Sequence, residues 1–300
     1  MHIPVLLHKV VSELRVSPGE IFLDCTMGNG GHTIAVAQAA AGPIVAIGID
    51  ENEDALARAQ SALARAGTPA KLWNGNFRNL DKALAENGAD SADAILFDLG
   101  VSSEELLESG RGFSFAKDEP LLMTFRKSAI GGGVTAHEVV NRWSEENLAT
   151  IIEGFGDELY AKRIAHAIAT AREPREQWGE RAPIETSRAL ADIVASVVPR
   201  KGKTHPATKT FQAIRMAVND ELPALAEGLQ KALAALRAGG RIAVISFHSG
   251  EDRIVKMFFK ESEKNGVGTT SKKPVVPSSE EVLENPRSRS AKLRIFVKNK

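Results

Sequence analysis

The sequence predicts an α/β protein whose open, mostly parallel sheet is interrupted by a helical insertion. Short apolar runs alternate with helical patterns over residues 20–100, as expected for consecutive strand–helix–strand units. Polar residues follow these runs at the points where strands should end. The alternation stops after residue 104 and resumes after residue 203, which predicts an insertion within one sheet domain.

The composition is that of a globular protein without a membrane segment. With 300 residues and 43% apolar content, the chain can bury roughly three quarters of its unfolded surface. No apolar run reaches the ~18 residues that a spanning helix needs, and the N-terminus lacks the pattern of a secretion signal. We therefore expect a cytoplasmic protein with no membrane partner. The single cysteine, Cys25, falls on a predicted buried strand and is interpreted as a core residue.

Residues 20–33, EIFLDCTMGNGGHT, predict a short buried strand over 21–23, a glycine-rich turn and a helix over 33–41. Gly28, Gly30 and Gly31 permit positive φ and let a ligand approach the backbone closely. This pattern is typical of a cofactor cradle. It also occurs in turns that only connect a strand to a helix.

A short helix that ends at 17–19 is predicted before the first strand. Further strands are predicted over 44–49, 70–73 and 92–97. Asp50 at the second strand end is placed to accept hydrogen bonds from a ribose, and it can also cap the helix over 52–65. Phe77 can cover an adenine ring, although its spacing favours a core anchor. Four strand ends carry polar residues, which predicts one ligand crevice at the carboxyl edge of the sheet: Asp24, Asp50, Asn76 and Asp98.

The later part of the chain is predicted to be helical and then to return to the sheet. Helices are expected over 145–154, 157–172 and 184–198, and one long helix over 208–237. A strand over 241–247, a helix over 250–260, a loop over 265–286 and a strand over 292–297 follow. The predicted domains are therefore 1–104 with 204–300, and the helical insertion 105–203.

Two cofactor classes fit this arrangement, nicotinamide dinucleotides and S-adenosylmethionine. The dinucleotide pattern G-x-G-x-x-G, aligned on Gly28 and Gly30, places Thr33 where its third glycine should be. A methyl donor has no pyrophosphate to seat on a helix N-terminus. The residues favour S-adenosylmethionine, and a nicotinamide-dependent oxidoreductase is the alternative.

Seven stretches between residues 2 and 294 carry a family resemblance: HIPVLLHKVV, DCTMGNGGHT, DLGVSS, GRGFSF, HPATKTFQAIRMAVNDEL, SFHSGEDRIVK and NPRSRSAKLR. In them the chain resembles the bacterial 16S ribosomal RNA cytosine-N4 methyltransferases. The resemblance implies a Rossmann-like methyltransferase sheet with an inserted helical domain, S-adenosylmethionine as cofactor and no metal. It also implies methyl transfer to the N4 amine of a decoding-centre cytidine. The implied partner is 16S rRNA in the small ribosomal subunit, with no DNA.

The resemblance also assigns residues to the cofactor. It implies that the donor contacts the glycine-rich turn at Gly28. It also implies that Gly30, Gly31 and His32 contact the methionine end of the donor. Three more positions complete the implied set: Asp50 for the ribose, Phe77 for the adenine and Asp98 for the edge that faces the substrate.

The chain departs from the family pattern at two places. Glu105 stands where relatives usually have glutamine, which keeps an acceptor and removes a donor. Residues 120–126, PLLMTFR, replace a more polar pattern that includes an acid. This loop makes a second function conceivable, a donor-binding RNA or ribosome assembly factor with weak or lost turnover.

For the chemistry, the exocyclic amine of cytosine must be held by acceptors and aligned with the methyl group. Asp98 and the 99–102 turn with Ser102 are the catalytic candidates. His248 is another possible acceptor, but a structural histidine is the favoured interpretation.

The target base should be single-stranded or flipped out, because pairing would hide its amine. Two basic stretches without acids, 200–209 and 285–300, are expected to hold phosphates. The expected RNA contacts are Lys209, Arg215, Arg287, Arg289 and Arg294.

Overall fold

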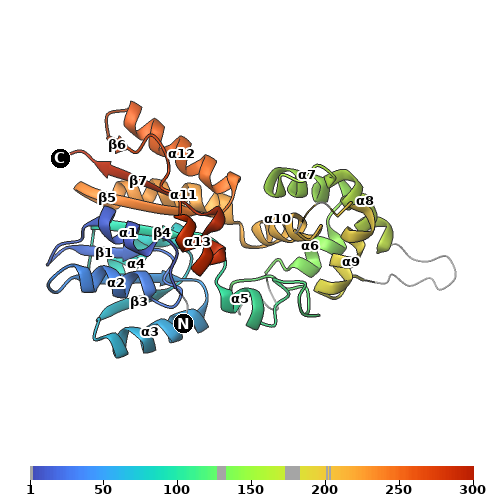
Figure 1. The fold of residues 1–300 in the computed structure, drawn as a ribbon, viewed down its shortest axis with the longest axis horizontal. Helices are drawn as coiled ribbons and strands as arrows, with labels where there is room; N and C mark the ends of the chain where they lie inside the picture. Colours follow the sequence, from blue (N-terminus) through green and yellow to red (C-terminus); the bar gives the residue numbers. More distant parts are fainter. Residues whose placement is uncertain (1–2, 127–132, 173–182, 201, 203) are drawn as a thin grey trace. The chain divides into compact units, whose positions relative to one another are not determined.

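The computed structural model describes residues 3–126, 133–172, 183–200, 202 and 204–300 (Figure 1). The chain forms two compact units. The sheet unit comprises Met1–Gly100 and Leu222–Lys300, and the helical unit comprises Val101–Glu221. Among the described residues, no helix combines the length and the apolar character needed to cross a membrane.

The sheet unit contains a seven-stranded sheet in the order β3-β2-β1-β4-β5-β7-β6, which confirms the predicted α/β fold. Strands β1 to β5 pair in parallel, whereas β7 runs antiparallel to both β5 and β6. The strand order reverses between β1 and β4, and ligands bind at such a switch point in open α/β sheets. The strands are β1 Ile21–Asp24, β2 Val45–Asp50, β3 Ala70–Asn74, β4 Ala92–Asp98, β5 Leu236–Ser246, β6 Gly268–Thr270 and β7 Lys292–Lys298.

Apolar side chains are packed on both faces of the sheet. Successive side chains along a strand point to opposite faces, so neighbouring residues belong to different clusters. Phe22 belongs to one apolar cluster and its neighbour Leu23 to another. On β4, Leu96 and Phe97 divide between the same two clusters. The helices of this unit are α1 Leu7–Leu14, α2 Gly31–Ala39, α3 Glu53–Ala66, α4 Leu80–Glu86, α11 Glu221–Ala235, α12 Ser249–Lys264 and α13 Ser279–Glu284, with 3-10 turns η1 Phe77–Asn79 and η3 Pro286–Ser290.

The helical unit has an apolar core of its own. Thr135, Ser144 and Thr186 cap three of its helices by accepting a backbone N–H, a role for which their short hydroxyl side chains are suited. The helices are α5 Ser103–Glu108, α6 Ala136–Arg142, α7 Glu145–Gly156, α8 Ala161–Ala171, α9 Ser187–Val197 and α10 Thr208–Asn219.

The expected long helix over 208–237 is wrong. Asp220 has a left-handed backbone with φ of 52°, which ends α10 and separates it from α11. Helix α10 buries Phe211 and Ile214 in the helical core, so the second domain boundary, expected at residue 204, falls at Glu221. The expected loop over 265–286 is also wrong, because it contains β6 and α13.

The 120–126 loop is packed into the helical unit. Leu121 and Met123 are buried in its core. The Arg111 guanidinium donates to the carbonyls of Thr124 and Phe125 at 2.8 and 2.7 Å. The apolar residues of this loop therefore have a structural function.

Candidate active site

Residues 25–32, which comprise the turn between β1 and α2 and the first two residues of α2, are called the glycine loop. Gly28 and Gly30 have φ of +50° and +80°, a conformation that strains residues with a side chain. The Met27 N–H donates to the Ile49 carbonyl at 2.8 Å, and the Gly28 N–H donates to Asp50 Oδ2 at 2.8 Å. The loop is therefore folded onto the end of β2, with its glycines at the switch point.

Asp50 holds the glycine loop and the next helix together. Its Oδ2 accepts from Gly28, and its Oδ1 accepts from the Asn52 N–H at 2.8 Å. The carboxylate is half-buried, and its expected contact with a ribose stays a prediction.

His32 and Asp98 form a buried pair at the carboxyl edge of β1 and β4. His32 Nε2 lies 3.3 Å from Asp98 Oδ2, and the side chains are 6% and 23% exposed. This is an ion-pair distance, but neither ring nitrogen of His32 has a hydrogen bond of good geometry within the described part of the chain. The same holds for Asp98 Oδ1.

A second carboxylate, Asp24, lies close enough to this pair to interact electrostatically with both side chains. It is 1% exposed and accepts from Thr33 Oγ1 at 2.8 Å and from the Thr26 N–H at 3.2 Å. Burial raises the pKa of the Asp24 carboxyl. Burial alone would lower the pKa of His32, but the interaction with Asp98 and the charge of Asp24 outweigh it, so that the pKa of His32 is raised.

Buried polar atoms in folded proteins nearly always have a partner, so an orphaned one requires an explanation, and a bound ligand is one such explanation. Here the orphaned atoms are an acceptor on Asp98 and two ring nitrogens on His32. Asp98 ends β4, and His32 lies in the first turn of α2, directly after the left-handed Gly30. A ligand with both anionic and cationic groups, such as the methionine end of S-adenosylmethionine, fits this set of partners.

The chain matches the MraW methylase family over residues 1–299. It belongs to this family. Three relatives are each named Ribosomal RNA small subunit methyltransferase H. The relative from Symbiobacterium thermophilum is 42% identical, with 99% of this chain and 96% of the relative covered. That from Heliobacterium modesticaldum is 43% identical, with coverage of 99% and 98%. That from Kosmotoga olearia is 42% identical, with coverage of 98% and 96%.

Phe77 acts as a core anchor in this MraW-family protein. Its ring contacts Phe97 edge-on with centroids 5.4 Å apart, and a Cβ added at Gly228 would lie 2.9 Å from Phe77. The ring is half-buried, so its predicted contact with adenine stays a prediction.

Two predicted residues fall in the helical unit. The Ser102 carbonyl accepts from the Leu106 N–H at 3.1 Å at the start of α5. The side chain of Glu105 lies outside the described part of the structure. The roles expected for both in an MraW-family site stay predictions.

The five expected RNA contacts divide into exposed and paired residues. Arg287, Arg289 and Lys209 are exposed, and Lys209 Nζ also donates to the Asp157 carbonyl at 2.7 Å.

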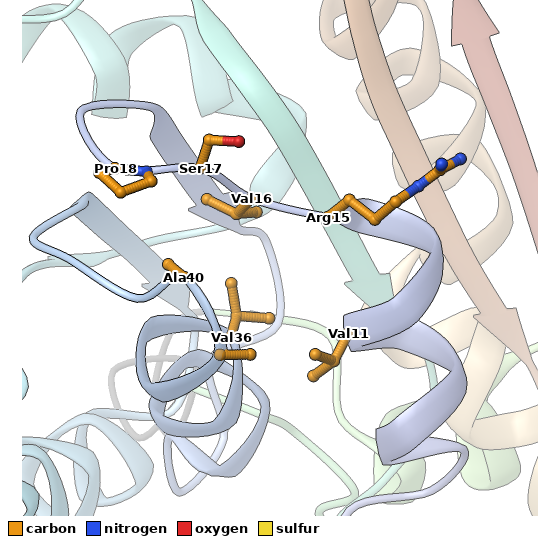
Figure 2. A pocket seen from close by; sticks show the side chains of 8 residues that line it. Val11, Arg15, Val16, Ser17, Pro18, Val36 and Ala40 are labelled. Carbon is orange, nitrogen blue, oxygen red and sulfur yellow. The ribbon is translucent and has the colours of Figure 1, made fainter.

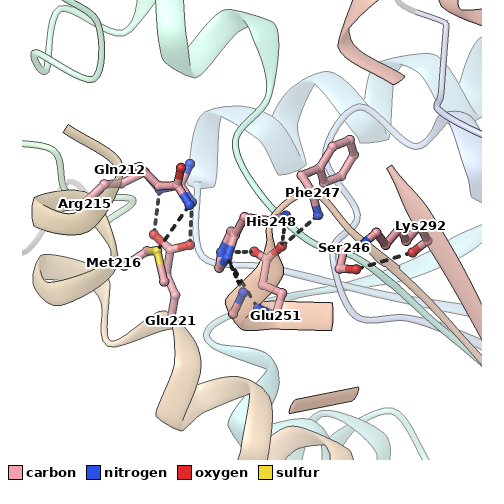
Figure 3. Close-up of polar contacts among 10 residues, drawn as sticks. Gln212, Arg215, Met216, Glu221, Ser246, Phe247, His248, Glu251 and Lys292 are labelled. Atoms are coloured by element: carbon pink, nitrogen blue, oxygen red, sulfur yellow. Dashed lines mark hydrogen bonds and ion pairs between the residues drawn. The ribbon is translucent and has the colours of Figure 1, made fainter. Parts of the chain in front are cut away.

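The expectation for Arg294 is wrong, because its guanidinium is 6% exposed and bonded to Asp252 at 2.7 and 3.2 Å. Arg215 is also corrected, since its side chain is 15% exposed and binds Glu221 through both carboxylate oxygens at 2.7 and 2.8 Å (Figure 3). A guanidinium committed to a carboxylate inside the protein is not available to a phosphate.

His248 is a structural residue, as favoured from the sequence. Its Nδ1 accepts from the Gly250 and Glu251 N–H groups at 3.2 and 3.3 Å, and Glu251 Oε2 accepts from Phe247 and His248 (Figure 3). This is a reciprocal capping box at the start of α12. Cys25 is also confirmed as a core residue, and burial raises the pKa of its thiol well above the usual value.

Two threonines that support the site were not singled out from the sequence. Thr26 Oγ1 accepts the Asp98 N–H at 2.6 Å, which joins the glycine loop to the end of β4. Thr33 donates to the buried Asp24. Both lie within the DCTMGNGGHT motif, so a hydroxyl next to a strand-end acid was the signal available.

A separate pocket of about 350 Å³ lies at the amino end of β1 (Figure 2). Its labelled walls come from α1, α2 and the connection to β1. It contains Val11, Val16 and Val36 and a single charged residue, Arg15. Because the strand ends of the site are at the opposite edge, this pocket is distinct from the proposed ligand site.

Proposed function

We propose that the protein transfers a methyl group from S-adenosylmethionine to the N4 amine of a cytidine in small-subunit ribosomal RNA. The proposed target is a decoding-centre cytidine of 16S rRNA. The observation that carries the donor site is the buried His32–Asp98 pair, whose orphaned atoms lie beside the glycine loop. The names of the relatives support the substrate class.

In this proposal the sheet unit is the donor-binding domain. Gly28 and Gly30 let the donor approach the backbone, and Asp50 accepts from the ribose hydroxyls. His32, with its raised pKa, holds the carboxylate of the methionine end as a cation. Bound S-adenosylmethionine supplies a methyl group activated by a sulfonium.

Asp98 is the residue proposed to hold the target amine. Its backbone is fixed by the Thr26 hydroxyl, Oδ2 lies 3.3 Å from His32 Nε2, and the orphaned Oδ1 is the atom that would accept an amine hydrogen. Alignment of the amine at near-attack distance supplies much of the acceleration. A strong base is not needed, because the methylated ammonium is acidic enough to release its proton to Asp98 or to water.

Single-turnover methyl transfer to small subunits that lack the modification tests this function. We expect the wild-type protein to produce N4-methylcytidine at one position. Asp98→Asn should slow transfer by about 10- to 100-fold, the value of one charged hydrogen bond of roughly 1.5–3 kcal/mol. Binding of donor and subunit by the wild-type protein without any transfer would instead support the assembly-factor alternative.

The RNA part of the proposal rests on Arg287 and Arg289. They are exposed in η3, and no acid occurs in residues 285–300. Replacing both with alanine should weaken subunit binding and reduce the log-log salt slope by about 0.7 per lost single-strand contact. Lys272 and Lys273, which are also exposed, provide the matched control pair. An unchanged salt slope would exclude phosphate contacts at the two arginines.

A further inference from the structure

The N-terminal HIPVLLHKVV stretch has no role in the function proposed above, yet the structure ties it to the site. The Leu6 N–H donates to Glu281 Oε1 of α13 at 2.6 Å. Asn285, which follows α13, donates from Nδ2 to the Ile3 carbonyl at 3.0 Å. Two side chains near the C-terminus therefore hold the backbone of residues 3–6.

Leu6 is in a strained conformation. Its φ of 54° and ψ of 29° are left-handed, and its side chain is 1% exposed. Such a backbone is unfavourable for a residue other than glycine, so it persists only where the surroundings fix it. The Glu281 carboxylate fixes it here, since it accepts the N–H at the start of α1, where a negative charge is favourable.

Pro4, within this segment, lies against the glycine loop. A Cβ added at Gly31 would lie 2.5 Å from Pro4 Cγ, closer than real Cβ contacts. The absence of a side chain at Gly31 is thus explained by Pro4 and needs no ligand. Gly31 directly precedes His32, so contacts run from Glu281 through Leu6 and Pro4 to the site.

We propose that Glu281 and Pro4 are positioning residues of the glycine loop. The α13 carboxylate fixes residues 3–6, and this segment determines where Gly31 and His32 lie. That the loop then presents His32 to the methyl donor rests on the proposed function. Helix α13 leads directly into η3, which carries Arg287 and Arg289. Through α13, residues 3–6 therefore connect the proposed RNA contacts to the proposed donor site.

Amide hydrogen exchange in the protein without donor tests the positioning by itself. Glu281→Ala should increase exchange at the Gly30 and Ile34 amides by about tenfold, with little change on β4 and β5. Glu281→Gln should behave as wild type, because its amide oxygen still accepts the Leu6 N–H. Glu280→Ala, an exposed neighbour in the same turn, is the matched control. Unchanged exchange in the loop, or an equal increase throughout the sheet, would overturn the proposal.

A double-mutant cycle on donor affinity then separates two explanations for Gly31. Gly31→Ala should weaken binding of S-adenosylmethionine, and adding Pro4→Ala should restore most of the loss by removing the atoms that collide. If the loss is the same in both backgrounds, the new methyl group collides with the ligand and Pro4 has no positioning role. If the wild-type protein binds no donor, the proposed function fails, and the exchange experiment still decides the role of Glu281.

Discussion

Two buried charged clusters in the sheet unit differ in how completely their atoms are paired. Arg294 and Asp252 share two hydrogen bonds, and Lys292 Nζ lies 3.3 Å from the same carboxylate. His32 is as enclosed as Arg294, whereas Asp98 is 23% exposed, and both side chains of this pair leave orphaned atoms. Burial of charge alone therefore does not identify a functional site. Unsatisfied atoms alone do not identify one either, because Nε2 of the structural His248 is also orphaned; the position beside the glycine loop at the switch point distinguishes His32 and Asp98.

The largest expected effect tests the paired cluster. Arg294→Ala should destabilise folding by roughly 2–3 kcal/mol, because it leaves Asp252 buried with only Lys292 beside it. Arg287→Ala, at an exposed position of the same basic stretch, should leave the free energy of unfolding nearly unchanged. Chemical denaturation of both variants measures the difference. Equal stabilities would remove the distinction between the two arginines.

A somewhat smaller effect is expected at the donor site. Asp50→Ala should weaken binding of S-adenosylmethionine by about 1–3 kcal/mol, because it removes a charged hydrogen-bond partner and the acceptor of the Gly28 N–H in the glycine loop, while the sheet stays folded. Calorimetric titration measures the affinity, with the exposed Asp90→Ala as control. Unchanged affinity in Asp50→Ala would exclude the ribose contact.

The contributions of the two clusters to folding stability should depend on pH in opposite directions. The raised pKa of His32 means that its contribution to stability is complete below about 6.5 and is lost as pH rises through the folded pKa. Burial raises the pKa of Asp252, but Arg294 and Lys292 outweigh it and lower the pKa. The contribution of Asp252 is therefore present above about 3.9 and is lost as pH falls through its folded pKa.

Nuclear magnetic resonance titration of the His32 ring checks the first of these directions. The pKa should lie above about 6.5 in the wild-type protein and should fall in Asp98→Asn. A wild-type value below 6.5 would contradict the proposed imidazolium.

The smallest effect is expected in the helical unit. The Leu122 side chain is partly buried in the loop that differs from the family pattern, and its neighbours Leu121 and Met123 fill the core. Leu122→Asp should raise the single-turnover rate by less than about tenfold, under ~1.4 kcal/mol in the barrier, because alignment of the substrate needs no acid there. Rescue of a nearly inactive wild-type protein by a hundredfold would show that this chain has lost a catalytic acid.

The sequence predicted the regular parts of the sheet unit well, because local patterns determine them. The strand end at Asp98 and the glycine loop follow from short apolar runs and from residues that tolerate positive φ. Arg294 shows what such patterns cannot predict. Its position in a basic stretch suggested a phosphate contact, whereas pairing with Asp252 depends on how α12 packs against β7.

Packing between distant elements, which local patterns do not determine, also explains the wrong domain boundary and the features of the site that were not predicted. The helical pattern continues across Asp220, and only the packing of Phe211 in the helical core assigns α10 to that unit. Within the site, the sequence predicted that Asp98 ends a strand at the ligand edge of the sheet, and the family resemblance assigned His32 to the methionine end of the donor. The sequence could not show that their nitrogens and oxygen remain unpaired, because this depends on the placement of every surrounding side chain.

The insertion has a consequence for synthesis. Strand β4 is made before the whole of Val101–Glu221, and its parallel partner β5 is made afterwards. Until then, one edge of β4 has unpaired backbone groups, which is a recognised risk for aggregation. The helical unit, with its separate core, can fold during this interval. The last strands to emerge, β6 and β7, complete the sheet, and α13 then brings Glu281 to the N-terminal segment made at the start. With Glu281 as the proposed positioning residue, the glycine loop of the nascent chain reaches its final position only after α13 has been made.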